Sequence, residues 1–155
     1  MRVIEVRSAE ARDEAALWEL IRAFPTPTPI SADAYARMFQ RKLDDPCALI
    51  AVARQGETLV GYVSGHKHSA FYAAGDTAWV DEIFVVNHGR RMGVGRSLMT
   101  AFESWADDVG CKLASLATIG AADFYRALGY ATKAGYFKKY LGDGKQSTEP
   151  SRQAK

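Results

Sequence analysis

The segment that most constrains the fold joins an apolar run to a helical pattern through a basic, glycine-containing loop. The run Ile83-Phe84-Val85-Val86 is typical of a buried strand, and apolar residues recur at helical spacing from Leu98 onward. Between them lies Arg90-Arg91-Met92-Gly93-Val94-Gly95-Arg96-Ser97. Two glycines separated by one residue let the backbone turn tightly and approach a ligand, and the free N–H groups at a helix start attract an anion. The sequence therefore predicts a strand, a loop that binds phosphate or pyrophosphate, and a helix.

The arginines of this loop suit phosphate oxygens, although an ordinary surface loop with solvated arginines would have the same composition. A Walker A loop requires Gly-Lys-Ser/Thr after its glycines, and this chain has Gly95-Arg96-Ser97 instead. A dinucleotide-binding fingerprint requires a third glycine at the position that Leu98 occupies. The loop therefore matches neither of these phosphate-binding motifs.

Two motifs in the right order give the chain a family resemblance. The first is Arg-x-x-Gly-x-Gly, formed by Arg90, Gly93 and Gly95, and the second is Ala121-Ala122-Asp123-Phe124-Tyr125-Arg126-Ala127-Leu128-Gly129-Tyr130. With them the chain resembles the GNAT superfamily of acetyl-CoA-dependent N-acetyltransferases over residues 79–141, and the first half agrees in its order of elements. The resemblance implies a GNAT-like α/β (α+β) fold, with a mixed, mostly antiparallel central sheet flanked by helices on both faces.

The resemblance also implies how acetyl-CoA is held as the cosubstrate. The loop would grip the pyrophosphate, and the pantetheine arm would pair with the backbone of the preceding strand, where one N–H near Val85 would stabilise the oxyanion. Thr118 stands where the family motif usually has asparagine, and this departure leaves the cofactor affinity open. The implied cofactor-binding residues are Ile83, Phe84, Val85, Arg90, Arg91, Met92, Gly93, Val94, Gly95, Arg96, Ser97, Thr118 and Tyr125.

Acetyl transfer to an amine requires a group that removes the amine proton, and Asp81 and Glu82 are the candidates. Successive strand residues point to opposite faces, so alternation places Asp81 on the face of Ile83 and Val85, with Glu82 on the other. We expect Asp81 to be the base, because it also matches the acidic position of polyamine acetyltransferases in the family. A β-bulge would exchange the two roles, and a surface acidic pair that binds nearby cations is the alternative.

The leaving thiolate requires a proton donor or a hydrogen bond. Tyr125 matches the tyrosine that the family uses for this step, and a core tyrosine is the alternative. The resemblance further places a wall of the acceptor pocket between the first two helices. It thereby makes Phe24, Tyr35 and Phe39 candidate substrate-binding residues. The alternative is that these three side chains belong to the hydrophobic core.

Composition limits the remaining classes of function. The chain has 155 residues, of which 48% are hydrophobic, and this suits one domain with a substantial core. A formal charge of +2 is too small to predict a nucleic-acid surface, and no apolar run is long enough for a membrane span. Cys47 and Cys111 lie in apolar runs and predict buried thiols in a cytoplasmic protein. We expect no metal site, with His66 and His68 at the surface or at a pocket rim.

Periodicity and turn residues predict the elements in order. Helices are expected at residues 9–23 with Ser8 as the cap, from about residue 31 with Met38 on its buried face, from the loop to a stop at Gly110, and around residues 124–128 before Gly129. Strands are expected at residues 3–6, 47–54, 58–65, 77–86, 111–116, 130–132 and 136–141, with a hairpin turn at residues 55–57.

We therefore expect one acetyltransferase domain at residues 1–141 and a flexible polar tail at residues 142–155, which could rest on a neighbouring chain in a homodimer. The expected activity is transfer of an acetyl group from acetyl-CoA to a primary amine of a small molecule or peptide, by direct attack in a ternary complex. A catalytically weak acetyl-CoA-binding sensor is the alternative. The sequence does not identify the acceptor.

Overall fold

The computed structural model describes residues 3–142. The chain divides into two compact units, Met1–Thr118 and Ile119–Lys155. Within the described residues, the first unit holds a five-stranded sheet and three α-helices, and the second holds one short helix, α4 (Ala122–Ala127). The single domain expected at residues 1–141 stays a prediction. The predicted tail, apart from Gly142, lies outside the described residues.

The chain enters the sheet through β1 (Ile4–Ser8) and then forms a short 3-10 helix (Ala11–Asp13) that leads into α1 (Glu14–Ala23). Asp13 fixes this entry, because its carboxylate accepts hydrogen bonds from Arg7 at 2.7 and 2.9 Å and from the Glu10 N–H at 2.8 Å. The hydrogen bonds from Arg7 hold the pKa of Asp13 below its usual range. The predicted cap at Ser8 is wrong, because Ser8 is the last residue of β1.

The proline-containing segment 25–29 separates α1 from α2 (Ala32–Asp44), as predicted. The Ser31 hydroxyl caps α2 by accepting a hydrogen bond from the Ala34 N–H at 3.1 Å. Tyr35 and Phe39 are buried, whereas Met38 is 46% exposed. Met38 therefore lies outside the buried stripe that the sequence predicts for it.

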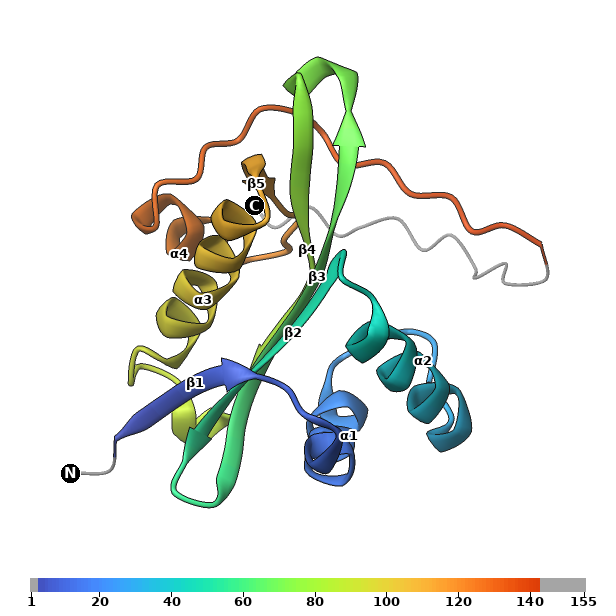
Figure 1. Ribbon diagram of the computed structural model, residues 1–155. Coiled ribbons are helices and arrows are strands. Elements are labelled where there is room, and N and C mark those ends of the chain that lie inside the picture. Colours follow the sequence, from blue (N-terminus) through green and yellow to red (C-terminus); the bar gives the residue numbers. More distant parts are fainter. Residues whose placement is uncertain (1–2, 143–155) are drawn as a thin grey trace. The chain divides into compact units, whose positions relative to one another are not determined.

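The sheet has the order β1-β2-β3-β4-β5 and is mostly antiparallel, which confirms the predicted fold class. The strands β2 (Ala48–Gln55), β3 (Thr58–Ala70) and β4 (Gly75–Val85) form a meander, and β5 (Cys111–Ser115) runs parallel to β4. In the first unit, α3 (Val94–Asp108) packs on one face of the sheet, and α1 and α2 pack on the other (Figure 1). We call these the α3 face and the α1/α2 face.

A β-bulge interrupts the pairing of β3 with β4. Ser64 lies opposite Glu82, but the next residue of β3, Gly65, lies opposite Val80, so Asp81 is the extra residue on β4. Gly65 helps to explain this irregularity, because a Cβ there would overlap both the Trp79 carbonyl oxygen and the Phe102 ring of α3. A glycine at this position lets β3, β4 and α3 approach one another closely.

The second unit departs from the sequence prediction after α4. The helix itself is present, and Gly129 follows it with a positive φ of 94°, as expected for a helix stop. The strands predicted at residues 130–132 and 136–141 do not form in the described part of the chain. Tyr136 and Phe137 are 63% and 94% exposed, so the pattern of apolar residues here reflects neither ladder pairing nor burial.

Candidate active site

The outer edge of β4 carries free backbone groups beyond the bulge. The ladder between β4 and β5 ends at the pair Trp79 and Ser115, so residues 80–85 pair with β3 alone. The Val86 N–H donates to the Val60 carbonyl oxygen at 2.9 Å. Because antiparallel residues alternate in the side to which they point their N–H and C=O groups, Ile83 and Val85 point theirs away from β3. An extended ligand could therefore hydrogen-bond along this edge.

The loop between β4 and α3 places a helix N-terminus close to the end of this edge in sequence. Arg91 and Gly93 both have a positive φ, 64° and 76°, and α3 begins at Val94. The N–H groups of the first helical turn, including that of Gly95, have no partner within the helix. Arg90 donates a hydrogen bond from Nε to the Val85 carbonyl oxygen at 3.4 Å. The strand, loop and helix predicted from the sequence are confirmed.

The remaining residues of the predicted loop are open to solvent. Arg90, Arg91, Met92, Arg96 and Ser97 are all exposed. The positive end of the α3 dipole and three arginine side chains within seven residues make this loop a suitable surface for a diphosphate.

Asp81 lies on the α1/α2 face, where two basic side chains contact it. Its Oδ1 atom is 3.0 Å from His66 Nδ1, and its Oδ2 atom accepts a hydrogen bond from Lys42 Nζ of α2 at 3.2 Å. This placement corrects the prediction that Asp81 shares a face with Ile83 and Val85. Simple alternation fails here because Asp81 is the extra residue of the bulge.

Glu82 also lies on the α1/α2 face. It shares a side of β4 with Phe84, which packs against the core cluster of α1, α2, β2 and β3. Burial raises the pKa of the Glu82 carboxyl above its usual range; the charge of Asp81 adds to this rise, and the charge of Lys42 opposes it. The bulge thus brings both carboxylates to one face rather than exchanging them.

Two buried hydroxyl groups of β3 accompany Glu82. The hydroxyls of Tyr62 and Ser64 are buried and have no hydrogen-bond partner among residues 3–142. Burial raises the pKa of Tyr62, and the nearby Glu82 charge raises it further, although no hydrogen bond of ordinary geometry joins the two groups. A buried hydroxyl without a hydrogen-bond partner lowers the stability of the folded state. Such groups often belong to functional sites.

The predicted acid Tyr125 belongs to the second unit. Its ring contacts Phe124 and Tyr130 edge-on, with ring centroids 5.0 and 5.9 Å away. Burial raises the pKa of the Tyr125 phenol. Thr118, the last residue of the first unit, is exposed and lies three residues beyond β5. Their roles stay predictions.

The three predicted substrate-binding residues occupy different environments. Phe24 is half-buried at the end of α1 and contacts Phe84 edge-on, with ring centroids 6.2 Å apart. Tyr35 and Phe39 are only 6% and 2% exposed, and the Tyr35 hydroxyl donates to the Glu14 carbonyl oxygen at 2.7 Å. Burial assigns Tyr35 and Phe39 to the core, and Phe24 stays the candidate substrate contact.

Lys42 and Tyr62 were not predicted as site residues, and His66 was predicted without a chemical role. His66 and His68 lie on the same side of β3, with ring centroids 5.7 Å apart. Nothing in the sequence marked Lys42 as a site residue, because lysines are common in the last turn of a helix. The alternation of Tyr62, Ser64 and His66 along β3 was the available clue to a polar row.

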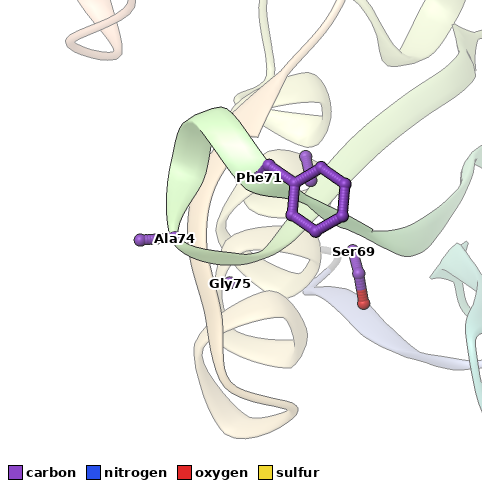
Figure 2. Close-up of a pocket in the computed structure, with 5 residues that line it drawn as sticks. Ser69, Phe71, Ala74 and Gly75 are labelled. Atoms are coloured by element: carbon purple, nitrogen blue, oxygen red, sulfur yellow. The ribbon is translucent and has the colours of Figure 1, made fainter.

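A shallow pocket of about 290 Å³ lies elsewhere, at the tip of the β3–β4 hairpin. Ser69, Ala70, Phe71, Ala74 and Gly75 line it, and Figure 2 shows the Phe71 ring beside it. None of these lining side chains is ionisable. Asp81 lies six positions beyond Gly75 in β4, about 20 Å along an extended strand, so this pocket is distinct from the bulge.

Three further observations concern the described residues alone. Cys47 and Cys111 are free thiols, each half-buried. No group of three histidine, cysteine or acidic side chains within residues 3–142 could hold a metal ion. No helix in that range has the length and apolar character that a membrane crossing requires.

The chain is similar to known proteins in sequence and in fold. The model of the acetyltransferase (GNAT) family matches residues 14–130. Aminoglycoside N(6')-acetyltransferase type 1 of Klebsiella aerogenes is 33% identical over 111 residues, which make up 68% of this chain and 72% of that protein.

Solved structures share the fold at low sequence identity. Glucosamine-6-phosphate N-acetyltransferase from Arabidopsis thaliana matches with a TM-score of 0.79 and 16% identity, covering 90% of this chain and 99% of that one. The aminoglycoside acetyltransferase AAC(6')-Iy, in complex with the bisubstrate analogue CoA-S-monomethyl-acetylneamine, matches with a TM-score of 0.77 and 17% identity, covering 90% and 99%.

Proposed function

Because the chain belongs to the acetyltransferase (GNAT) family, we propose that it transfers an acetyl group from acetyl-CoA to a primary amine of a small molecule by direct attack in a ternary complex. The observation that carries this proposal is the succession of a free strand edge, a loop with two left-handed residues, and the N-terminus of α3. This arrangement suits a ligand with an extended amide-containing arm and a diphosphate, and coenzyme A has both.

The pyrophosphate binds at the start of α3. The N–H groups of residues 93–96 donate to its oxygens, and Arg90, Arg91 and Arg96 balance its charge. The left-handed conformations of Arg91 and Gly93 support this assignment, because they turn the loop tightly ahead of the helix. The exposed Met92 and Ser97 border the site, and the buried Val94 anchors the helix start.

The pantetheine arm lies along β4 beside residues 83–85 and hydrogen-bonds with the outward N–H and C=O groups of Ile83. Phe84 points its side chain to the α1/α2 face and contributes packing there. The Val85 N–H is the donor that stabilises the oxyanion of the tetrahedral intermediate. Thr118 is the remaining proposed contact to the arm, with a shorter side chain than the asparagine of the family motif.

The acceptor binds on the α1/α2 face, near the bulge. Two carboxylates, those of Asp81 and Glu82, lie here with one lysine, Lys42, and the excess of acidic groups attracts a cationic amine. The half-buried Phe24 and Phe84 supply apolar contact. A polyamine-like or aminosugar acceptor fits this combination, and the relative from Klebsiella aerogenes, named as an aminoglycoside acetyltransferase, supports the aminosugar class.

The reaction then requires two proton transfers. The acidic pair at the bulge takes part in removing the amine proton, because it is the carboxylate group nearest to the free edge of β4 along the chain. Tyr125 gives a proton to the leaving thiolate or hydrogen-bonds it. Burial raises the pKa of the Tyr125 phenol, which favours a hydrogen bond to the thiolate over full transfer of the proton.

A panel assay tests the proposal. The full-length chain is incubated with acetyl-CoA and, in turn, an aminoglycoside, a polyamine, an amino acid and a peptide, and thiol release is followed. We expect release that depends on one of the amines. Calorimetry with coenzyme A and with ATP serves as the binding control. Coenzyme A binding without thiol release for any amine would instead indicate an acetyl-CoA-binding sensor, and binding of ATP alone would reject the cofactor assignment.

A further inference from the structure

His66 projects from β3 onto the face where the acceptor is proposed to bind. Gly65 faces α3, because a Cβ there would meet the Phe102 ring. His66, the next residue, therefore points to the α1/α2 face, as Tyr62 does. The imidazole reaches across to β4, where it meets Asp81.

The contacts of Asp81 leave it poorly placed to accept a proton itself. One carboxylate oxygen is 3.0 Å from His66 Nδ1, and the other accepts a hydrogen bond from Lys42 Nζ at 3.2 Å. Both carboxylate oxygens are therefore already in contact with a basic side chain before a substrate binds. The imidazole is better placed, because its side chain is 42% exposed and can meet a substrate.

The carboxylate also determines which ring nitrogen carries the proton. Neutral imidazole has one donor nitrogen and one acceptor nitrogen, and the hydrogen bond of one nitrogen fixes the role of the other. With Nδ1 donating to Asp81, Nε2 keeps its lone pair and can act as a base. The same division of roles operates wherever a carboxylate orients a catalytic histidine.

We propose that His66 receives the proton of the acceptor amine at Nε2, and that Asp81 is the positioning residue that holds the imidazole. This inference rests on the proposed acetyl transfer and names the proton acceptor within it. The other ionisable groups on this part of the α1/α2 face are Glu82 on β4, Lys42 on α2, and Tyr62 and His68 on β3. His68 differs from His66 in that its Nε2 atom lies 3.3 Å from the Thr77 hydroxyl.

The ammonium group of the acceptor first passes a proton to His66 Nε2. The free amine nitrogen then forms a bond to the thioester carbonyl carbon, and the carbonyl electron pair moves to oxygen. The electron pair on oxygen returns, and the carbon–sulfur bond breaks. The thiolate takes a proton from Tyr125, and the second proton of the nitrogen restores the phenol through solvent. His66 finally releases its proton to solvent.

The test replaces the imidazole but keeps the donor to Asp81. In His66→Asn the amide nitrogen takes the place of Nδ1, so the contact to Asp81 survives while the proton acceptor is lost. We expect kcat/KM for the best amine to fall by about 10²-fold or more. The acid limb of the pH profile should disappear, and added imidazole should restore part of the rate. His68→Asn is the matched control and should keep both the rate and the limb.

A wild-type pH profile in His66→Asn, or an equal loss in His68→Asn, would overturn the proposal. Coenzyme A binding by calorimetry and the melting temperature report whether each variant is folded. If His66→Asn does not fold, His66→Gln is measured in the same way.

A second measurement does not depend on turnover. Isotope-edited NMR of the imidazole nitrogens should show neutral His66 with its proton on Nδ1, and Asp81→Asn should lower the population of that tautomer. A proton on Nε2 in both proteins would contradict the proposed arrangement. If no amine is acetylated, the proposed function fails on the assay, and the tautomer measurement alone decides the relation between His66 and Asp81.

Discussion

Asp81 and Glu82 follow one another in β4, and both carboxylates lie on the face of the sheet that α1 and α2 cover. In a regular strand they would point to opposite faces. The bulge opposite Ser64 and Gly65 removes this alternation at Asp81. The two carboxylates differ in environment instead of in face: Asp81 is paired with Lys42 and His66, whereas Glu82 is more deeply buried.

This difference predicts unequal kinetic effects. Asp81→Asn should depress kcat/KM most at low pH, where the amine is mainly protonated, and should recover part of the deficit at high pH, where the free amine needs no base. Glu82→Gln should do less, because the carboxylate that contacts His66 is that of Asp81. The pH–rate profiles of both variants with one amine check this. Equal, pH-independent losses would show that neither carboxylate takes part in proton removal.

Glu82 also predicts a pH dependence of stability. Its pKa is raised in the folded chain, so the folded state binds more protons than the unfolded state between the usual carboxyl pKa and the raised value. Stability should therefore fall as the pH rises through this window. Glu82→Gln should increase the free energy of unfolding at about pH 8 and have little effect at about pH 4.

Urea denaturation of wild type and Glu82→Gln at both pH values measures the effect. Glu57→Gln is the control, because that side chain is 99% exposed and its removal should give no such gain. A Glu82→Gln protein that is less stable than wild type at high pH would show that the carboxylate forms a favourable interaction in the folded state.

The loop glycines should control cofactor binding. Gly93 has a φ of 76°, and valine in that conformation is strained by about 1–3 kcal/mol, so Gly93→Val should weaken coenzyme A binding about tenfold or more. Gly95→Val should weaken it as well, because a branched side chain would stand in the first turn of α3, where the backbone must approach the pyrophosphate.

Gly110→Val provides the control for strain alone. Gly110 has a φ of 83° and lies past the other end of α3, away from the loop. It should lose stability and keep its coenzyme A affinity in a calorimetric titration. Wild-type affinity in both loop variants would show that the pyrophosphate binds elsewhere.

Tyr125→Phe should keep coenzyme A binding and lower kcat by about 10²-fold or more where chemistry limits turnover, because the change removes a proton donor and little volume. Tyr130→Phe is the matched control, since Tyr130 contacts the Tyr125 ring in the same unit. Steady-state kinetics with a pre-steady-state check of the limiting step measure the effect. An unchanged kcat in Tyr125→Phe would exclude the phenol from the mechanism.

The sequence predicted the elements that depend on local pattern. The strand, loop and helix from residue 75 to residue 108 followed from an apolar run, two glycines and a helical repeat, and the stops at Gly110 and Gly129 followed from their position after a helix. Local chemistry determines these features, so a single sequence contains them.

The features that were missed depend on pairing between strands. The bulge at Asp81 arises from the register of β4 against β3 and from the close approach of Phe102 to Gly65. A glycine inside a strand often marks a β-bulge, and Gly65 lies inside β3. For the strands predicted at residues 130–132 and 136–141, alternation of apolar residues was the signal. Such alternation does not specify which strand would pair with them.

The central claim is acetyl transfer from acetyl-CoA to an amine, and identification of the product tests it most directly. The chain is incubated with acetyl-CoA labelled in its acetyl group and with the best amine of the panel, and the product is examined by NMR and mass spectrometry. We predict a labelled acetamide formed in equal amount to free coenzyme A, and no such product without the protein. Free coenzyme A accompanied by labelled acetate, with the amine unchanged, would contradict the account.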